Sequence, residues 1–136
     1  MDYKINFSER HKYDSRLEGI TVPAVLKTGR EEIELLAKLD TGSAYCLFER
    51  GCGEALGLPI EDGVHETIRT VNSRFDAYGH VISIQVLGIE TESTVYFFAD
   101  ASIKRNVLGR RGWLDKVRLC LVDYEQLVYV ADYNSR

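Results

Sequence analysis

Apolar and polar residues alternate along much of this chain, and the alternation predicts strands. The clearest case is the segment 33–39 (IELLAKL), in which every odd-numbered position is apolar. A period of two is typical of a strand that buries one face. Residues 20–26 (ITVPAVL) predict a second strand, and residues 27–30 (KTGR) between them have the composition of a turn. Two strands joined by a turn are therefore expected here.

The rest of the chain predicts further strands and only short helices. Strands are expected at residues 66–87, where two strands surround a polar tip at 70–74, and at 94–98, 117–122 and 127–130. Short helices are expected at 48–56, where Gly57 and then Pro59 follow, and at 110–116, where Trp113 would face the core. Because strands dominate, the sequence predicts an all-β domain.

The length of the chain is that of one domain. With 136 residues it is too short for two separate lobes with a cleft between them. The first residues are polar and aperiodic. We therefore expect a polar N-terminal arm over residues 1–18 and a folded domain over residues 19–136.

Composition and charge narrow the function further. The net charge of −4 excludes a grip on nucleic acid that is driven by overall charge. The N-terminus lacks the apolar core of a signal peptide, and no apolar run reaches the roughly 18 residues of a membrane span. The three cysteines, Cys46, Cys52 and Cys120, have the spacing of neither a zinc site nor a disulfide framework. We expect a reduced, cytoplasmic protein that binds neither nucleic acid nor membranes.

The sharpest chemical signal is Asp40-Thr41-Gly42-Ser43, directly after the strand at 33–39. The plain alternative is an Asp/Gly turn that only ends a strand. In a functional interpretation, the Asp40 carboxylate polarises a water for attack on a peptide carbonyl, and Gly42 admits backbone where a Cβ would clash. Thr41 would turn its hydroxyl into a buried hydrogen bond. Ser43 would donate to Asp40 and favour its charged form.

This chemistry needs two carboxylates, because one must act as a base while the other holds a proton. The chain has no second Asp-Thr-Gly. A two-fold homodimer would supply it by placing Asp40 of each copy at the axis. A weak internal echo of the motif, residues 107–109 (VLG), follows the later strands but carries no carboxylate.

The two motifs resemble those of the retropepsins, the retroviral-type aspartic proteases, and of their bacterial single-domain relatives. Residues 39–43 (LDTGS) match the catalytic motif, and residues 107–110 (VLGR) match the apolar-apolar-Gly-Arg motif of the second half. The similarity covers residues 20–130. It implies a closed, barrel-like acid-protease fold with one or two short helices and one lobe per chain. It also implies a homodimeric aspartic endopeptidase that acts on peptides or proteins and needs no metal or other cofactor.

The resemblance implies a role for each residue of these motifs. Asp40 would be the catalytic residue, Thr41 would grip the other subunit, and Gly42 would contact the substrate backbone. Ser43 would support the carboxylate, and Arg110 would brace the dimer through a carboxylate contact.

The flap of the family, which closes over substrate, would lie at residues 70–78. Val71, Asn72 and Ser73 would form its substrate-binding tip. The chain departs from the retroviral pattern in two places. Its tip contains no glycine, and Ala44 stands where retroviral enzymes usually carry an acid.

Other interpretations stay open. The fold could serve as a non-catalytic module for dimerisation or peptide binding. An unrelated small β-barrel, in which Asp40 only ends a strand, would be a monomer. A nucleophilic pair of Cys46 with His80 lacks a supporting signature. The densest basic cluster is interpreted as a solvated face: Lys104, Arg105, Arg110 and Arg111.

Overall fold

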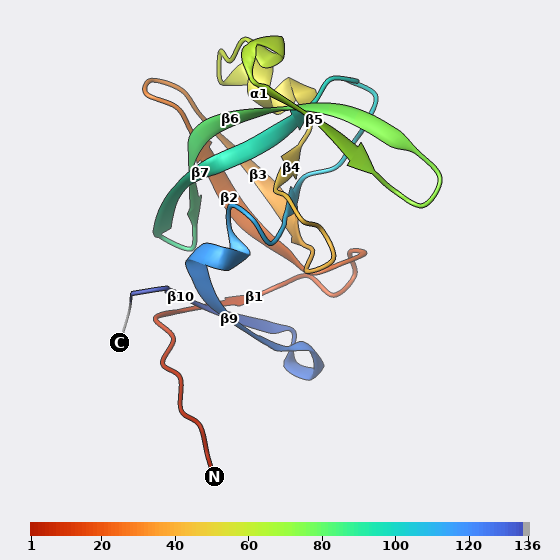
Figure 1. Cartoon of the computed structure of the whole chain (residues 1–136). Coiled ribbons are helices and arrows are strands. Elements are labelled where there is room, and N and C mark those ends of the chain that lie inside the picture. Colours follow the sequence, from red (N-terminus) through yellow and green to blue (C-terminus); the bar gives the residue numbers. More distant parts are fainter. Residues whose placement is uncertain (135–136) are drawn as a thin grey trace.

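The protein is built mainly from strands, and the computed structural model describes residues 1–134 of the chain. One sheet has seven strands and a second sheet has three (Figure 1). The larger sheet contains β2 (Thr21–Lys27), β3 (Glu32–Leu39), β4 (Leu47–Phe48), β5 (Val64–Arg69), β6 (Arg74–Val86), β7 (Ile89–Phe98) and β8 (Val107–Leu108). The smaller sheet contains β1 (Glu9–Lys12), β9 (Val117–Val122) and β10 (Leu127–Asp132). The all-β class expected from the sequence is confirmed.

In the larger sheet, successive strand pairings lead from β2 through the sheet and back to β2. The order is β2-β3-β8-β4-β7-β6-β5, and β2 also pairs with β6. β2 and β3 are the two strands expected from the alternation, in antiparallel register from Thr21 opposite Lys38 to Lys27 opposite Glu32. β6 and β7 form a long antiparallel pair that bends over the core (Figure 1).

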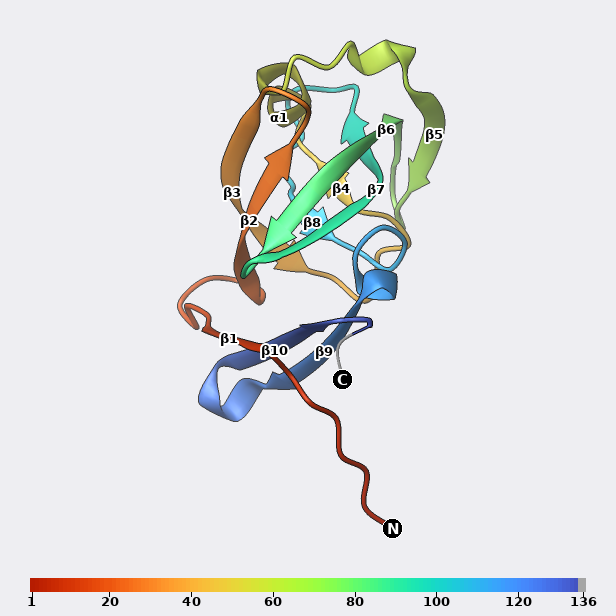
Figure 2. The ribbon, with the colours of Figure 1, turned by 90° about the vertical axis from the view of Figure 1, so that its left-hand side faces the viewer.

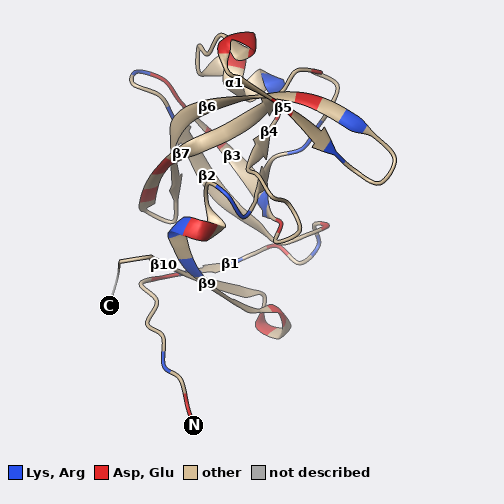
Figure 3. Ribbon diagram, in the orientation of Figure 1, with Lys and Arg blue, Asp and Glu red and all other residues tan. Residues whose placement is uncertain are grey.

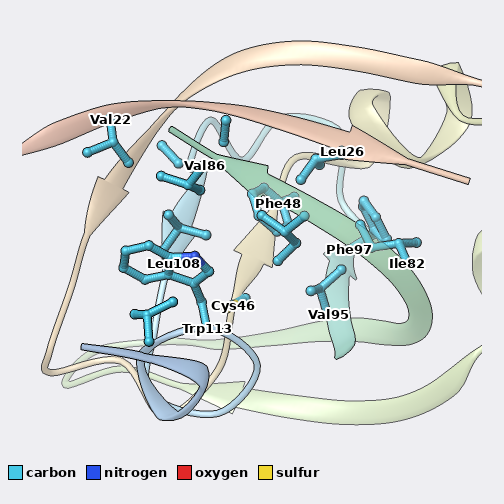
Figure 4. Close-up of a cluster of buried hydrophobic side chains, with 14 of the residues drawn as sticks. Val22, Leu26, Cys46, Phe48, Ile82, Val86, Val95, Phe97, Leu108 and Trp113 are labelled. Atoms are coloured by element: carbon cyan, nitrogen blue, oxygen red, sulfur yellow. The ribbon is translucent and has the colours of Figure 1, made fainter. Parts of the chain in front are cut away.

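The main core lies within this circuit of strands. Figure 4 shows side chains from β2, β4, β6, β7 and β8 converging there with Trp113. Phe48, Phe97 and Trp113 are fully buried. β3 has the expected alternation, since Ala37 is buried whereas Leu36 is exposed. Burial of each large apolar side chain contributes roughly 1.5–3 kcal/mol, so the core fixes the strands whose ends carry the candidate site.

The smaller sheet holds part of the N-terminal arm in the fold. β1 pairs antiparallel with β10, with Glu9 opposite Val130. Tyr13 follows β1 and is 5% exposed, and its hydroxyl donates to Asp123. Burial and this hydrogen bond raise the pKa of Tyr13 to about 12. The residues before β1 extend away from the sheet (Figure 2).

The helices are shorter than the sequence predicts. Within the described residues there is one α-helix, α1, which spans Arg50–Ala55, because Leu47 and Phe48 pair with β7 as β4. The helix expected at 110–116 is reduced to the 3₁₀ turn η2 (Leu114–Lys116). Gly112 has a φ of 110°, which no right-handed helix contains. The other 3₁₀ turns are η1 (Ile60–Asp62) and η3 (Asp123–Glu125). Within residues 1–134, no helix is long and apolar enough to cross a membrane.

Candidate active site

The two motifs singled out in the sequence meet at the ends of neighbouring strands. β3 and β8 are parallel, with Lys38 beside Val107 and Leu39 beside Leu108. The backbone N–H of Asp40 donates to the carbonyl of Leu108 over 3.0 Å. Asp40 therefore leaves β3 at the point where β8 turns towards Gly109.

The carboxylate of Asp40 has a partner on each oxygen. The backbone N–H of Gly42 donates to Oδ1 over 3.0 Å. The guanidinium of Arg105 lies 3.5 Å from Oδ2, and the side chains of Arg105 and Asp40 are 45% and 27% exposed. The carboxylate is thus positioned by its own turn and faces a positive charge at its open side.

The hydroxyl of Ser43 has a different partner from the one expected. It donates to the backbone carbonyl of Tyr45 over 2.7 Å, so the predicted bond to Asp40 is not formed in this structure. The backbone N–H of Ser43 donates to the carbonyl of Asp40, and its own carbonyl accepts from Arg110. The hydrogen bonds of Ser43 therefore shape the loop. The amide of Gly42 donates to the Asp40 carboxylate in place of the Ser43 hydroxyl.

The glycine of the second motif is enclosed by the loop of the first. A Cβ on Gly109 would overlap the backbone carbonyl of Tyr45 and come within 2.8 Å of the carbonyl oxygen of Ser43. The amide of Gly109 also lies 3.4 Å from the thiol of Cys46. Only glycine allows the two backbones to approach so closely. This contact fixes the loop that carries Asp40 against the end of β8.

A cleft of about 550 Å³ opens in front of Asp40. One wall is the loop that follows β3, and the other is strand β5 of the β5–β6 hairpin. Arg105 closes it near the carboxylate. The lining residues are Asp40, Gly42, Ser43, Ala44, Tyr45, Leu47, Glu66, Thr67, Ile68, Arg69, Thr70 and Arg105. The cleft thus lies between the loop that follows β3, which forms its floor, and the β5–β6 hairpin.

At the tip of the β5–β6 hairpin, Val71, Asn72 and Ser73 lie outside the lining of this cleft, whereas Thr70 belongs to it. The backbone N–H of Thr70 donates to the carbonyl of Ser73 over 2.9 Å, which closes a tight turn. Val71, Asn72 and Ser73 are exposed on it, Val71 to 99%. The structure therefore brings Asp40, Gly42 and Ser43 together in one cleft and leaves the predicted substrate-binding tip in solvent.

A second cavity, of about 450 Å³, lies beside the first, and the side chains of Thr41 and Arg110 line it. Its other lining residues are Ala44, Arg111, Leu114 and Asp115. Thr41 and Arg110 are both exposed. Among residues 1–134, no carboxylate lies within ion-pair distance of Arg110. The two residues expected at a subunit contact are therefore neighbours on one exposed surface.

The pairing of Cys46 with His80 is absent from the described part of the chain. Burial raises the pKa of Cys46 to about 12, so its thiol is a poor nucleophile near neutral pH. His80 instead places Nε2 2.9 Å from the carbonyl oxygen of Ile60. All three cysteines are free thiols. In residues 1–134 no three His, Cys, Asp or Glu side chains cluster closely enough to hold a metal ion.

Arg105 is the residue that the sequence interpretation missed. Its neighbours in sequence, Lys104 and the nearby Arg110 and Arg111, made it look like part of a solvated basic face. The pairing of β3 with β8 brings it to Asp40 instead. Its position two residues before the apolar strand of the second motif was the only available signal.

Comparison with solved structures identifies the fold. The EIAV protease in complex with the inhibitor HBY-793 aligns with a TM-score of 0.55 and 16% identity, over 71% of this chain and 86% of that chain. A retropepsin-like aspartic protease from Rickettsia conorii gives 0.65 and 13%, over 93% and 99% of the two chains. The retroviral protease-like domain of Ddi1 from Leishmania major gives 0.61 and 14%, over 88% and 91%.

The chain therefore has a retropepsin-like fold, as the two motifs led us to expect. These similarities are structural, since no family model and no curated protein matches the sequence.

Proposed function

We propose that the protein is an aspartic endopeptidase that works as a homodimer. The observation that carries the proposal is the position of Asp40. It stands at the end of β3, accepts a hydrogen bond from the amide of Gly42, and lines the cleft between the loop that follows β3 and the β5–β6 hairpin. The three solved structures of similar fold are described as a protease, a protease and a protease-like domain.

The reaction follows from two such carboxylates, one from each copy. An ionised Asp40 takes a proton from water as the water oxygen bonds to the peptide carbonyl carbon. The protonated Asp40 of the second copy donates to the carbonyl oxygen as the bond forms. The first Asp40 then passes its proton to the amide nitrogen, and the second takes a proton from a hydroxyl of the diol as the carbon–nitrogen bond breaks. This leaves a new carboxyl group and a new amino group and restores both Asp40 side chains.

A second copy is required because one chain supplies one Asp-Thr-Gly motif. Thr41 and Arg110 border an exposed cavity next to Asp40, and we assign this surface to the subunit contact. The substrate would lie extended between the floor and strand β5. Backbone pairing would give affinity there, and alternate side chains would enter pockets.

A non-catalytic peptide-binding module is the second candidate, and two observations favour it. Arg105 already occupies the open side of the Asp40 carboxylate. The hairpin tip, residues 70–74 (TVNSR), has no glycine to ease its movement. A module of this kind would bind peptides in the cleft and release them uncut.

The substitution Asp40→Asn tests the proposal. We expect it to lower cleavage of a fluorogenic peptide library by about 10²- to 10⁴-fold, the usual contribution of a general acid or base. The free energy of unfolding should stay unchanged, because Asp40 is partly exposed. Asp62→Asn, an exposed carboxylate on η1, is the matched control and should cleave as the wild type does. Equal cleavage by wild type and Asp40→Asn would refute the mechanism.

Dilution tests the shared site separately. Specific activity should fall when the protein is diluted below its dimer dissociation constant. Sedimentation at the same concentrations reports the monomer fraction. Activity per chain that stays constant as the monomer fraction rises would exclude a site built from two copies.

A further inference from the structure

Arginine side chains lie in the cleft and in the cavity beside it. Arg105 and Arg69 line the cleft itself, and Arg110 and Arg111 line the adjoining cavity. The acidic residues in the two linings are Asp40, Glu66 and Asp115. Within the cleft, the two arginines are matched by Asp40 and Glu66, so its formal charge is balanced, on a protein whose net charge is −4. Figure 3 shows basic positions on both strands of the β5–β6 hairpin.

Arg105 has spare capacity for an anionic ligand. Its contact to Asp40 is a single long ion pair, 3.5 Å from Nη2 to Oδ2. A guanidinium has five N–H donors in a fork that matches a carboxylate. Within residues 1–134 this is the one ion pair of Arg105, and its side chain remains 45% exposed. A side-chain carboxylate of a bound peptide could take a bidentate position that Asp40 does not take.

Catalysis would require Asp40 to loosen this contact. Its carboxylate must bind the attacking water and approach the carboxylate of the second copy. An exposed ion pair of this length is worth only about 1 kcal/mol or less. A better-placed carboxylate would therefore replace Asp40 as the partner of Arg105 at little cost, and the exchange would free Asp40 for the water.

Arg69 adds a second positive charge to the same cleft. It is the last residue of β5, and its side chain is exposed. Within the described residues, it forms no ion pair. An acidic residue of the peptide that lies between floor and hairpin would meet Arg105 and have Arg69 on the opposite wall.

From this geometry we propose that the cleft selects peptides with an aspartate or glutamate next to the scissile bond, and that Arg105 is the residue that recognises it. The proposal rests on the assignment of the cleft as the peptide site. It makes Arg105 a specificity-determining residue, since it acts on the substrate side chain and takes no part in the proton transfers.

The experiment compares matched peptides that differ only by Glu and Gln at successive positions around one cleavable bond. Wild type should cleave the best Glu peptide about threefold to tenfold faster than its Gln twin, as judged by kcat/KM. The preference should fall at high salt, because screening weakens exposed ion pairs. Arg105→Ala should abolish it and Arg105→Lys should keep part of it.

Lys104→Ala is the matched control. It removes the same charge one residue earlier, but Lys104 does not line the cleft. Its Glu/Gln ratio should equal that of wild type. A ratio near one in wild type, or one that Arg105→Ala leaves unchanged, overturns the proposal.

Binding separates this proposal from the enzymatic one. Calorimetry with Asp40→Asn measures peptide affinity without turnover. Tighter binding of Glu peptides with no cleavage by wild type would refute the endopeptidase and support the acidic preference. Cleavage without a Glu preference would support the endopeptidase and refute the acidic preference. Equal or absent binding of the two peptides to wild type and Asp40→Asn overturns the role of Arg105.

Discussion

The ends of β3 and β8 carry the same kind of apolar strand followed by a glycine turn, yet the two turns differ in almost every physical respect. Gly42 is exposed, and the nearest atom to a Cβ placed on it is Oδ1 of Asp40 at 3.2 Å. Gly109 is buried between the carbonyls of Tyr45 and Ser43. One turn opens into a cleft of about 550 Å³, and the other is sealed.

The two turns have different tasks: the sealed turn positions the loop, and the open turn presents the carboxylate. In the sealed turn, Gly109 has no side chain. It contacts its neighbours through its backbone, and its amide lies against the thiol of Cys46. The open turn carries Asp40. It is held in place by the hydrogen bond from the backbone N–H of Asp40 to the carbonyl of Leu108, next to the sealed turn. A repeated local pattern thus yields a buried support in one copy and an accessible carboxylate in the other.

The largest expected effect concerns the thiol at the sealed turn. Burial raises the pKa of Cys46 from its ordinary value near 9 to about 12. At pH 8 its thiolate fraction should be about a thousandfold below that of an unfolded chain, and labelling is slower in proportion. We expect this rate difference in a Cys52→Ala/Cys120→Ala variant treated with a thiol reagent, native against urea-unfolded.

The pH dependence gives a second readout of the same thiol. Because the pKa is raised, the labelling rate of the folded protein should keep rising with pH well beyond 9. Rapid labelling of the native variant at pH 8 would mean that the turn opens often, and the contrast between the two turns would be lost.

The next effect is on stability, through Gly109→Ala. The added methyl group has to displace the backbone carbonyls of Tyr45 and Ser43. Overpacking of this kind lowers the free energy of unfolding by about 3 kcal/mol. Urea denaturation followed by tryptophan fluorescence measures it, since Trp113 is the one tryptophan of the chain and is buried. A loss below about 1 kcal/mol would show that the loop yields easily.

The smallest effect on stability is expected for Gly42→Ala. Its methyl group meets only Oδ1 of Asp40, and a shift of a few tenths of an ångström relieves the contact. The free energy of unfolding should change by about 0.5 kcal/mol or less, as for surface substitutions in general. Peptide cleavage should fall even though the free energy of unfolding hardly changes, because the methyl group projects beside the carboxylate. Destabilisation equal to that of Gly109→Ala would erase the distinction between the turns.

Much of the fold could be predicted because strand patterning is local. The alternation at 33–39 set both the existence of β3 and its buried face. β1 was missed because its sequence, ERHK, has no apolar period, and it is held by backbone pairing to β10. The helix expected at 110–116 failed for a different reason, since a single positive φ at Gly112 stops it.

The candidate site was predictable in part for similar reasons. The position of Asp40 follows from its place at a strand end, which is a local property. The partners of its carboxylate are not local. Arg105 reaches it through a pairing between distant strands, and the hydroxyl of Ser43 turns to Tyr45 within a loop whose shape Gly109 dictates.

The bond from the amide of Asp40 to the carbonyl of Leu108 has a consequence for synthesis of the chain. Position 40 leaves the ribosome long before position 108. At typical elongation rates the delay is on the order of several seconds. During that interval the growing chain already contains its aspartate but not the support that positions it. A nascent chain therefore lacks the positioned Asp40 until β8 has been made and has paired with β3.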